Sequence, residues 1–487
     1  MNKKMIVAII IVAVFCGALL FYLGEKQVPA SEVPAIKKID SEKQNVNVFP
    51  APEQTVYAMK LYLDVEERLL YGVSEITTIN TSGSDLKEIW LTAYPNAFKS
   101  AGETPAPLLA YEKGFDEGWM EIRELLVNGE SANFIQDGPS VGITMPSIAT
   151  QSNVNIEINW VVHVPNVKYR FGYHDQVFML GNFYPVINLK TDAGWHNAYL
   201  SGVGDPFCLT VGDYIVEVNI PENYQIASTG QIVASDYQDD GRSIMVVRAE
   251  EVRDFCLLVM YDYDKAQETI NGVNINCIFP SEGEEEAEKV LQQTGQILQF
   301  YSETFGPYPL GAFTVAYVPM EGFQGMEHAG IIFLQEELLQ NKNEANHKIF
   351  LLAHEIAHQW WFGMVGNDQI QEPWLDEGLA NWSAHLFMRE MKEIETHSWQ
   401  TKSKSMVLNQ ELSNMQNRTQ YYNTAYRAGE AFWVGLEKEI GYENVIKILR
   451  AYLSRYRNSV ATTSDLLQII QEYSPGDVDP YLNQWFL

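Results

Sequence analysis

The chain has 487 residues, of which 46% are hydrophobic, so it carries enough apolar material for two or three folded domains. Lys and Arg total 33 against 63 Asp and Glu, which gives a formal net charge of −30. A surface this acidic repels phosphate groups, so general nucleic-acid binding and adhesion to anionic lipid through a basic surface are both excluded.

The N-terminus carries a long uncharged segment over residues 5–23. A helix of nineteen residues spans about 28 Å, close to the hydrocarbon thickness of a bilayer. Lys3 and Lys4 precede it, which favours a cytoplasmic tip over residues 1–4 and an outside position for everything that follows. We therefore expect an uncleaved transmembrane signal anchor at 5–23 and a polar linker at 24–52, in a single-pass protein of the cell membrane whose catalytic part is extracytoplasmic. A cleaved signal peptide is the alternative.

Two hydrophobic periods divide the rest of the chain. From 53 to 265, apolar and polar residues alternate in short segments separated by turn residues, which predicts an N-terminal domain of antiparallel strands, a saddle or sandwich. From 266 to 487 the spacing is mainly helical, and the predicted helices cover 284–304, 346–362, 376–392, 429–440, 444–456 and 463–473. The expected fold class is α+β with two domains.

The predicted helix 346–362 contains the motif His354-Glu-Ile-Ala-His358. Residues four apart share one helix face, so both imidazoles can reach one ion, and Glu355 can reach a water bound to that ion. The alternative is a helix with two histidines that face the core or solvent. Glu377 weighs against that alternative, because it follows His358 after eighteen intervening residues at the start of the next helix.

Two histidines and a glutamate leave the fourth tetrahedral position for water, as in catalytic zinc sites. Zinc lowers the pKa of such a water to ~7, and a carboxylate can take the proton as the water attacks a carbonyl. The sequence therefore predicts one zinc ion per chain, bound by His354, His358 and Glu377, with Glu355 as the catalytic base.

This motif resembles the zinc signature of the gluzincin aminopeptidases related to aminopeptidase N and leukotriene hydrolase. The flanking residues 359–361 and 374–378 are similar too, and softer likenesses occur at 72–76, 91–96, 181–185, 204–207 and 305–309. The resemblance implies a β saddle followed by a thermolysin-like α/β zinc peptidase domain. Larger relatives carry a C-terminal helical domain that roofs the cleft, and because this sequence ends near the close of the catalytic domain we expect a more open cleft.

The segment Gln324-Gly-Met-Glu-His328 resembles the family's Gly-Ala-Met-Glu-Asn. The resemblance implies that Glu327 binds the free α-ammonium of the substrate and that Gly325 and Met326 belong to the same substrate-binding segment. A carboxylate there favours a cation and measures one residue from the terminus. His328 departs from the family pattern, and we expect it to pair with Glu327 or with the water on the metal.

Residues 421–429 resemble the family's Tyr-x-Lys-Gly segment, although Ala428 replaces the lysine. The resemblance implies that Tyr426 donates a proton to the oxyanion of the tetrahedral intermediate, with Tyr421 as the alternative donor. Asp376, beside Glu377, is a candidate for orienting a ligand.

These residues lead to one main hypothesis, a membrane-anchored zinc aminopeptidase that acts outside the cell on peptides with a free N-terminus. One alternative is a zinc peptidase of the same fold dedicated to a single protein or peptide, motivated by the open cleft and by His328. Another is a catalytically silent binding module, against which the complete set of site residues argues. The preferred N-terminal residue and the oligomeric state stay open.

Overall fold

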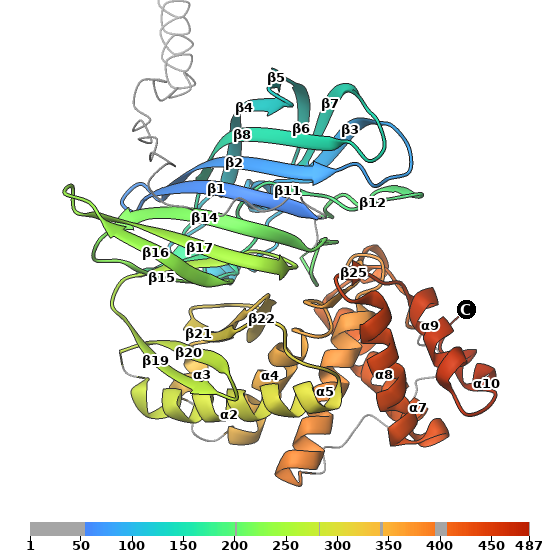
Figure 1. The fold of residues 1–487 in the computed structure, drawn as a ribbon. Coiled ribbons are helices and arrows are strands. Elements are labelled where there is room, and N and C mark those ends of the chain that lie inside the picture. The colour runs from blue at the N-terminus through green and yellow to red at the C-terminus, as the bar shows by residue number, and fades with distance from the viewer. Residues whose placement is uncertain (1–53, 200–201, 282, 341–343, 395–406, 487) are drawn as a thin grey trace, which may run out of the picture. The chain divides into compact units, whose positions relative to one another are not determined.

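The computed structural model describes residues 54–199, 202–281, 283–340, 344–394 and 407–486 (Figure 1). These residues belong to one structural unit, Pro52–Leu487. The predicted anchor at 5–23 and the linker at 24–52 lie outside them. Within the described ranges, none of the helices is both long and apolar enough to cross a membrane.

An eight-stranded sheet forms the larger part of the N-terminal domain, with the order β16-β17-β14-β1-β2-β8-β4-β5. Its strands are β1 (Thr55–Asp64), β2 (Leu69–Ile79), β4 (Trp119–Val127), β5 (Glu130–Ser131), β8 (Asn153–His163), β14 (Gly212–Pro221), β16 (Gln231–Tyr237) and β17 (Arg242–Val252). Burial alternates along β1 as the period of two requires. The prediction of antiparallel strands needs one correction, because β1 and β14 pair in parallel. The long chain segment between them allows the crossover that parallel pairing needs.

Two four-stranded sheets complete this domain, with the orders β15-β18-β10-β9 and β11-β3-β7-β6. Their strands are β3 (Leu86–Thr92), β6 (Asn133–Asp137), β7 (Ser140–Ile148), β9 (Phe171–His174), β10 (Val177–Leu180), β11 (Val186–Ile187), β15 (Gln225–Ser228) and β18 (Leu257–Met260). Apart from these, β12 (Lys190–Thr191) and β13 (Gly194–Trp195) form a small hairpin, and the 3₁₀ turns η1 (Tyr94–Phe98) and η2 (Leu108–Ala110) interrupt the strands. A continuous aromatic and aliphatic core fills the domain.

The second domain begins with a five-stranded sheet of order β19-β20-β21-β23-β22. Its strands are β19 (Tyr263–Ile270), β20 (Val273–Pro280), β21 (Ala312–Val318), β22 (Gly325–His328) and β23 (Ile331–Gln335). Asn271 and Gly272 join β19 to β20, and both have positive φ, as a two-residue hairpin turn favours. The sheet of the second domain thus begins at Tyr263, inside the range 53–265 that the sequence predicts for the β domain.

Helices cover one face of this sheet and extend beyond it. They are α2 (Glu284–Thr304), α3 (Glu337–Gln340), α4 (Ala345–Ala357), α5 (Trp374–Lys392), α6 (Arg418–Tyr421), α7 (Gly429–Ile440), α8 (Tyr442–Tyr456), α9 (Thr463–Tyr473) and α10 (Asp479–Leu482). Between them lie a 3₁₀ turn, η3 (Leu412–Asn414), a π-helix, η4 (Tyr422–Ala428), and the short strands β24 (Val365–Gly366) and β25 (Ser459–Val460).

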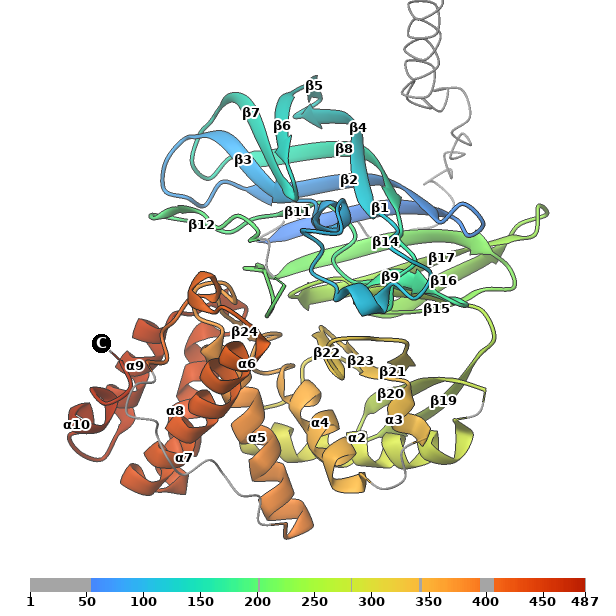
Figure 2. The ribbon, with the colours of Figure 1, turned by 180° about the vertical axis from the view of Figure 1, so that it is seen from behind.

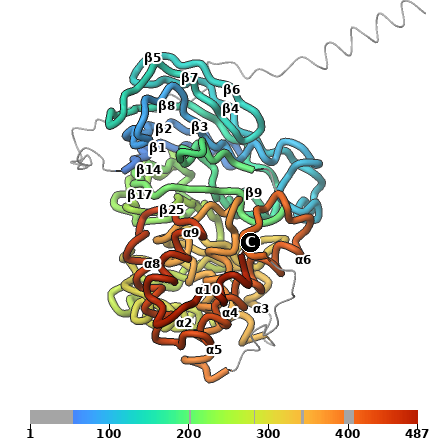
Figure 3. The backbone as a smooth tube through the Cα atoms, turned by 90° about the vertical axis from the view of Figure 1, so that its right-hand side faces the viewer, coloured from blue at the N-terminus to red at the C-terminus, as the bar shows by residue number. Residues whose placement is uncertain are grey.

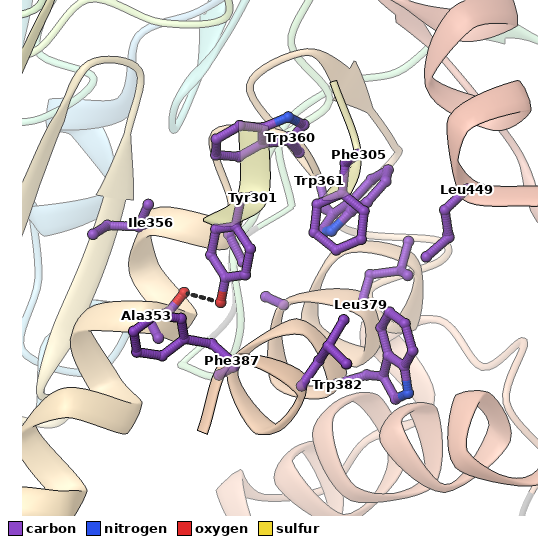
Figure 4. Close-up of a cluster of buried hydrophobic side chains, with 14 of the residues drawn as sticks. Tyr301, Phe305, Ala353, Ile356, Trp360, Trp361, Leu379, Trp382, Phe387 and Leu449 are labelled. Atoms are coloured by element: carbon purple, nitrogen blue, oxygen red, sulfur yellow. Dashed lines mark hydrogen bonds between the residues drawn. The ribbon is translucent and has the colours of Figure 1, made fainter. Parts of the chain in front are cut away.

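The core between these helices is rich in aromatic side chains (Figure 4). The hydroxyl of Tyr301 on α2 donates to the carbonyl of Ala353 on α4 at 3.0 Å, which fixes the zinc-motif helix against its neighbour. Helix α4 ends at Ala357 rather than at 362 as predicted. The amides of Gly363 and Met364 bond back to the carbonyls of His358 and Gln359, so the chain turns away from the helix axis there.

The two domains are joined through a buried contact as well as through the chain. Side chains of β10 and β18 pack against the face of the five-stranded sheet that the helices leave uncovered. Arg253, which follows β17, is buried and donates to the carbonyls of Phe362 and Ser459 in the second domain. Figure 3 shows β17 and β25 near each other at this contact.

Candidate active site

Helices α4 and α5 lie side by side (Figure 2) and bring the predicted metal ligands together. His354 lies in the last turn of α4, His358 caps it, and Glu377 lies in the first turn of α5. The Nε2 atoms of the two histidines are 3.2 Å apart. Oε2 of Glu377 lies 3.3 Å from Nε2 of His354 and 3.5 Å from Nε2 of His358. All three side chains are buried.

These distances fit a single zinc ion. Four ligand atoms at ~2.0–2.1 Å around a tetrahedral ion are separated from one another by about 3.3 Å. Nδ1 of His358 lies 3.0 Å from the carbonyl oxygen of Trp361, which orients the ring and leaves Nε2 for the metal. Oε2 of Glu377 has no hydrogen-bond partner among the described residues. His354, His358 and Glu377 therefore have the geometry and chemistry of a three-ligand zinc site.

A second group of potential ligands, His196, Cys208 and Asp368, behaves differently although its atoms also converge. Nδ1 of His196 is only 2.5 Å from Oδ2 of Asp368, well below the separation of two ligands on one ion. Nε2 of the same ring lies 3.0 Å from the hydroxyl of Thr191. The pair is therefore a hydrogen bond between the two domains rather than a metal site.

Glu355 faces β22 across the site. A Cβ atom on Gly325 would lie 2.0 Å from Oε1 of Glu355, so only glycine allows the strand and the carboxylate to approach this closely. Oε2 of Glu355 has no hydrogen-bond partner among the described residues. Burial raises the pKa of Glu355 to about 8, against the opposing effect of His358. A buried carboxylate with a raised pKa is suited to accept a proton and return it.

Glu327 lies on β22 beside the metal site. Its carboxylate, that of Glu355 and the imidazole of His358 have atoms within 4.8 Å of one another. Gln369 donates a long hydrogen bond of 3.5 Å to Oε1 of Glu327. Burial, reinforced by the charge of Asp205, raises the pKa of Glu327 well above its usual range. An incoming cation would relieve this repulsion between carboxylates.

The alternation of β22 separates the segment into two faces. Gly325 and Glu327 face the metal site, whereas Met326 and His328 lie on the opposite face of the strand. The Met326 side chain packs in the hydrophobic cluster between the domains. Nδ1 of His328 pairs with the carboxylate of Asp254, and both side chains are buried. The expectation that His328 pairs with Glu327 or with the metal water is therefore wrong, because neighbouring strand residues point to opposite sides.

Tyr421 and Tyr426 both reach Glu377. Tyr421 directly precedes the π-helix η4 and Tyr426 lies within it. Residues five apart in a π-helix fall on one face. The hydroxyl of Tyr426 donates to Oε1 of Glu377 at 2.5 Å and that of Tyr421 donates to the same oxygen at 3.0 Å. The Tyr426 ring also stacks on His354, with centroids 5.6 Å apart. Tyr421 is buried whereas Tyr426 is partly exposed, so Tyr426 is the phenol that a substrate can reach.

Asp376 bonds to the backbone of the neighbouring metal ligand Glu377 and also joins the two sides of the site. It accepts hydrogen bonds from Asn367 at 3.0 Å and from Gln369 at 2.8 Å, and its Oδ1 also accepts the backbone amide of Glu377. Because Gln369 also contacts Glu327, one amide side chain links the segment before the metal ligand Glu377 to the strand that carries Glu327.

Sequence reasoning missed an ion pair that the N-terminal domain contributes. Arg170 and Asp205 are buried and bonded to each other. The charge of Asp205 adds to burial in raising the pKa of both Glu327 and Glu355. The Arg170 guanidinium lies over the ring of Phe323, 5.3 Å from its centroid, just before β22. The weak similarity to the family at 204–207, which contains Asp205, was the one sequence signal that included a member of this pair.

Comparison with known proteins supports this description. Residues 290–485 match the peptidase family M1 domain. Aminopeptidase M1-B from Oryza sativa subsp. japonica is 23% identical over 247 residues, which is 46% of this chain and 28% of that protein. The alanine/arginine aminopeptidase of Saccharomyces cerevisiae is 25% identical over 230 residues, which is 43% of this chain and 27% of that protein. The chain thus spans little more than a quarter of the length of these relatives.

Solved structures extend the likeness over both domains. A mutant M1 zinc metallopeptidase from Deinococcus radiodurans superposes with a TM-score of 0.64 at 16% identity, covering 90% of this chain and 96% of that one. The same mutant bound to a Tyr-Ser-Ala substrate gives the same values. Residues 290–485 are therefore similar to a peptidase family M1 domain, and the chain as a whole shares the two-domain fold of the M1 zinc metallopeptidase from Deinococcus radiodurans.

Proposed function

We propose that this chain is a zinc aminopeptidase that removes N-terminal residues from peptides. One observation supports the proposal above the others: a buried glutamate, Glu327, lies within 4.8 Å of both Glu355 and His358 without being needed as a metal ligand. The carboxyl group held there offers a place for the substrate ammonium, whose positive charge would favour the ionised form of Glu327 and whose first peptide bond would then reach the metal.

Each side chain has a separate task in the proposed reaction. Glu327 binds the ammonium, Glu355 takes a proton from the attacking water and returns it to the leaving amine, and Tyr426 donates a hydrogen bond to the oxyanion. Zinc held by His354, His358 and Glu377 would supply Lewis-acid polarisation and a lowered water pKa. Tyr421 holds Glu377 from the side away from the histidines.

For location, we propose that residues 5–23 act as an uncleaved anchor and that the enzyme works outside the cell. The support comes from the uncharged segment and the two preceding lysines. Membrane fractionation of the full chain, followed by protease release of an active ectodomain, tests this. A mature N-terminus near residue 25 would replace the anchor by a signal peptide.

The activity is tested with one peptide in free-amine and N-acetylated forms, using wild type and Glu327→Ala. A hydrogen bond to a charged group contributes ~1.5–3 kcal/mol, or about one to two decades in binding. Wild type should strongly prefer the free amine, and Glu327→Ala should lose most of that preference while retaining zinc. A wild type that cuts the acetylated form as well or better is an endopeptidase of the same fold, and the proposal would then be wrong.

A further inference from the structure

Glu327 is useful for amine recognition only if its distance from the metal site is fixed. We propose that Asp254 and Gln359 are positioning residues that set this distance, each through two hydrogen bonds to the chain directly after Glu327. Neither touches the substrate in this scheme. The inference rests on the proposed aminopeptidase function and adds the residues that set the distance between Glu327 and the metal site.

Asp254 reaches the site from the N-terminal domain, in the segment between β17 and β18. One carboxylate oxygen pairs with Nδ1 of His328 and the other accepts the backbone amide of Ala329 at 2.9 Å. The carboxylate therefore holds the two residues that follow Glu327. Both bonds are fully buried, so water does not compete for them.

The His328 ring is held on its other side as well. A Cβ on Gly181 would lie 2.9 Å from Nε2 of His328, and the ring packs edge-on against Phe333 with centroids 5.2 Å apart. His328 is therefore wedged between the domains, and moving it would move the strand that carries Glu327. This gives a role to the residue that departs from the family motif.

Gln359 makes the complementary connection from the metal side. It directly follows the metal ligand His358, and its side-chain Nε2 donates to the carbonyl of His328 at 3.1 Å. Its Oε1 accepts the backbone amide of Gly330 at 2.8 Å. An amide that both donates and accepts is locked in one orientation. The strand with Glu327 is thus tied to the end of the helix that carries the metal ligands.

Arg253 completes the arrangement next to Asp254. Its guanidinium donates to the carbonyls of Leu209, Phe362 and Ser459 at 2.9–3.0 Å, which holds the loop that follows His358. Two consecutive residues of the N-terminal domain therefore hold the chain on both sides of the site. This bracing has functional value because a displaced Glu327 would bind the substrate ammonium less tightly.

The test measures kcat and KM for free-amine and acetylated forms of one peptide, with zinc content and Tm, in the full chain. Asp254→Asn removes one of two acceptors, and Gln359→Met removes both contacts at similar volume. Each should raise KM for the free amine about 10-fold, as loss of ground-state binding does, with kcat and the acetylated substrate little changed. His328→Leu should behave likewise, whereas His328→Asn keeps a donor near the position of Nδ1 and should restore KM.

Asp213→Asn is the matched control. Asp213 is a buried carboxylate of the same domain that accepts the amide of Glu251 at 2.9 Å and does not bond to β22. It should lower Tm without changing KM. Two results would overturn the inference while the proposed function stands, provided that wild type prefers the free amine. In the first, Asp254→Asn, Gln359→Met and His328→Leu keep that preference. In the second, their activity falls equally with both substrates. A wild type without the preference overturns the proposed function and this inference with it.

Discussion

The two halves of the site are built in different ways. The metal half consists of His354, Glu355, His358 and Glu377, which come from two adjacent helices of one domain. The other half, called the amine half after its proposed role, centres on Glu327, and His328 on the same strand is held by Asp254 of the N-terminal domain. Chemistry placed on a helix is set by local spacing, whereas recognition at β22 is set by how two domains pack. Substitutions should therefore separate chemistry from recognition.

The largest effect is expected at Glu355. Glu355→Gln removes the base but leaves the three metal ligands, so kcat should fall by about 10²–10⁴-fold while zinc stays stoichiometric. Binding of a free amino acid as a competitive inhibitor should persist, because the amine half is untouched. Zinc analysis and inhibitor titration check both halves in one variant. Activity near wild type, or loss of zinc, would contradict the assignment of Glu355 as the base.

The next effect distinguishes the two tyrosines on Glu377. Tyr426→Phe should lower kcat by about 10²–10³-fold, because it removes a donor to the oxyanion. Tyr421→Phe removes a hydrogen bond to a metal ligand, so it should weaken zinc affinity by about 10–100-fold and lower kcat less when zinc is saturating. Because Tyr426 also donates to Glu377, a chelator should remove zinc more easily from both variants, and kcat at saturating zinc separates their roles. Equal kcat losses at saturating zinc would show that the structure does not distinguish their roles.

Gly325 lies where the two halves meet. Gly325→Ala places a methyl group against Oε1 of Glu355, and a displacement of ~1 Å would lower kcat/KM by up to about 10²-fold. Both kcat and KM should change, unlike in the three preceding variants. Gly102→Ala, where no atom lies within 4 Å, is the control and should match wild type. A Gly325→Ala enzyme with normal kinetics would mean that β22 can move away from Glu355.

The same division governs what the sequence could predict. His354 and His358 are four apart on a helix, so their shared face follows from the helix repeat alone. Glu377 follows from the motif, and helices α2, α7 and α9 begin and end at their predicted residues. The family likeness pointed to Glu327 but not to the partner of His328, because that partner, Asp254, belongs to the other domain. Asp254 and His328 are 74 positions apart in the sequence.

Other features depended on long-range contacts or unusual backbone. The π-helix that turns Tyr421 and Tyr426 to one face has no period that a helical pattern reveals. The end of α4 at Ala357 depends on backbone bonds in the turn around Gly363, since the apolar pattern itself continues through Trp360 and Trp361. The Arg170–Asp205 pair spans 35 positions and forms only when the N-terminal domain folds.

The smallest effect is expected at His196, which connects the amine half to the N-terminal domain through Asp368, next to Gln369. The hydrogen bond to Asp368 raises the pKa of His196 above its usual 6.5. Protonation is therefore favoured in the folded chain, and the resulting stability is fully present below pH ~6.5 and lost as pH rises through the raised pKa. Because the ring is partly exposed, the contribution should be only about 0.5–1 kcal/mol. Wild type should exceed His196→Gln in Tm by more at pH 5.5 than at pH 8.5. Asp368→Asn removes the partner and should abolish this pH dependence. A difference in Tm that is the same at both pH values would show that the contact stabilises the domain junction as a neutral hydrogen bond, and the amine half would then owe nothing to the charge of His196.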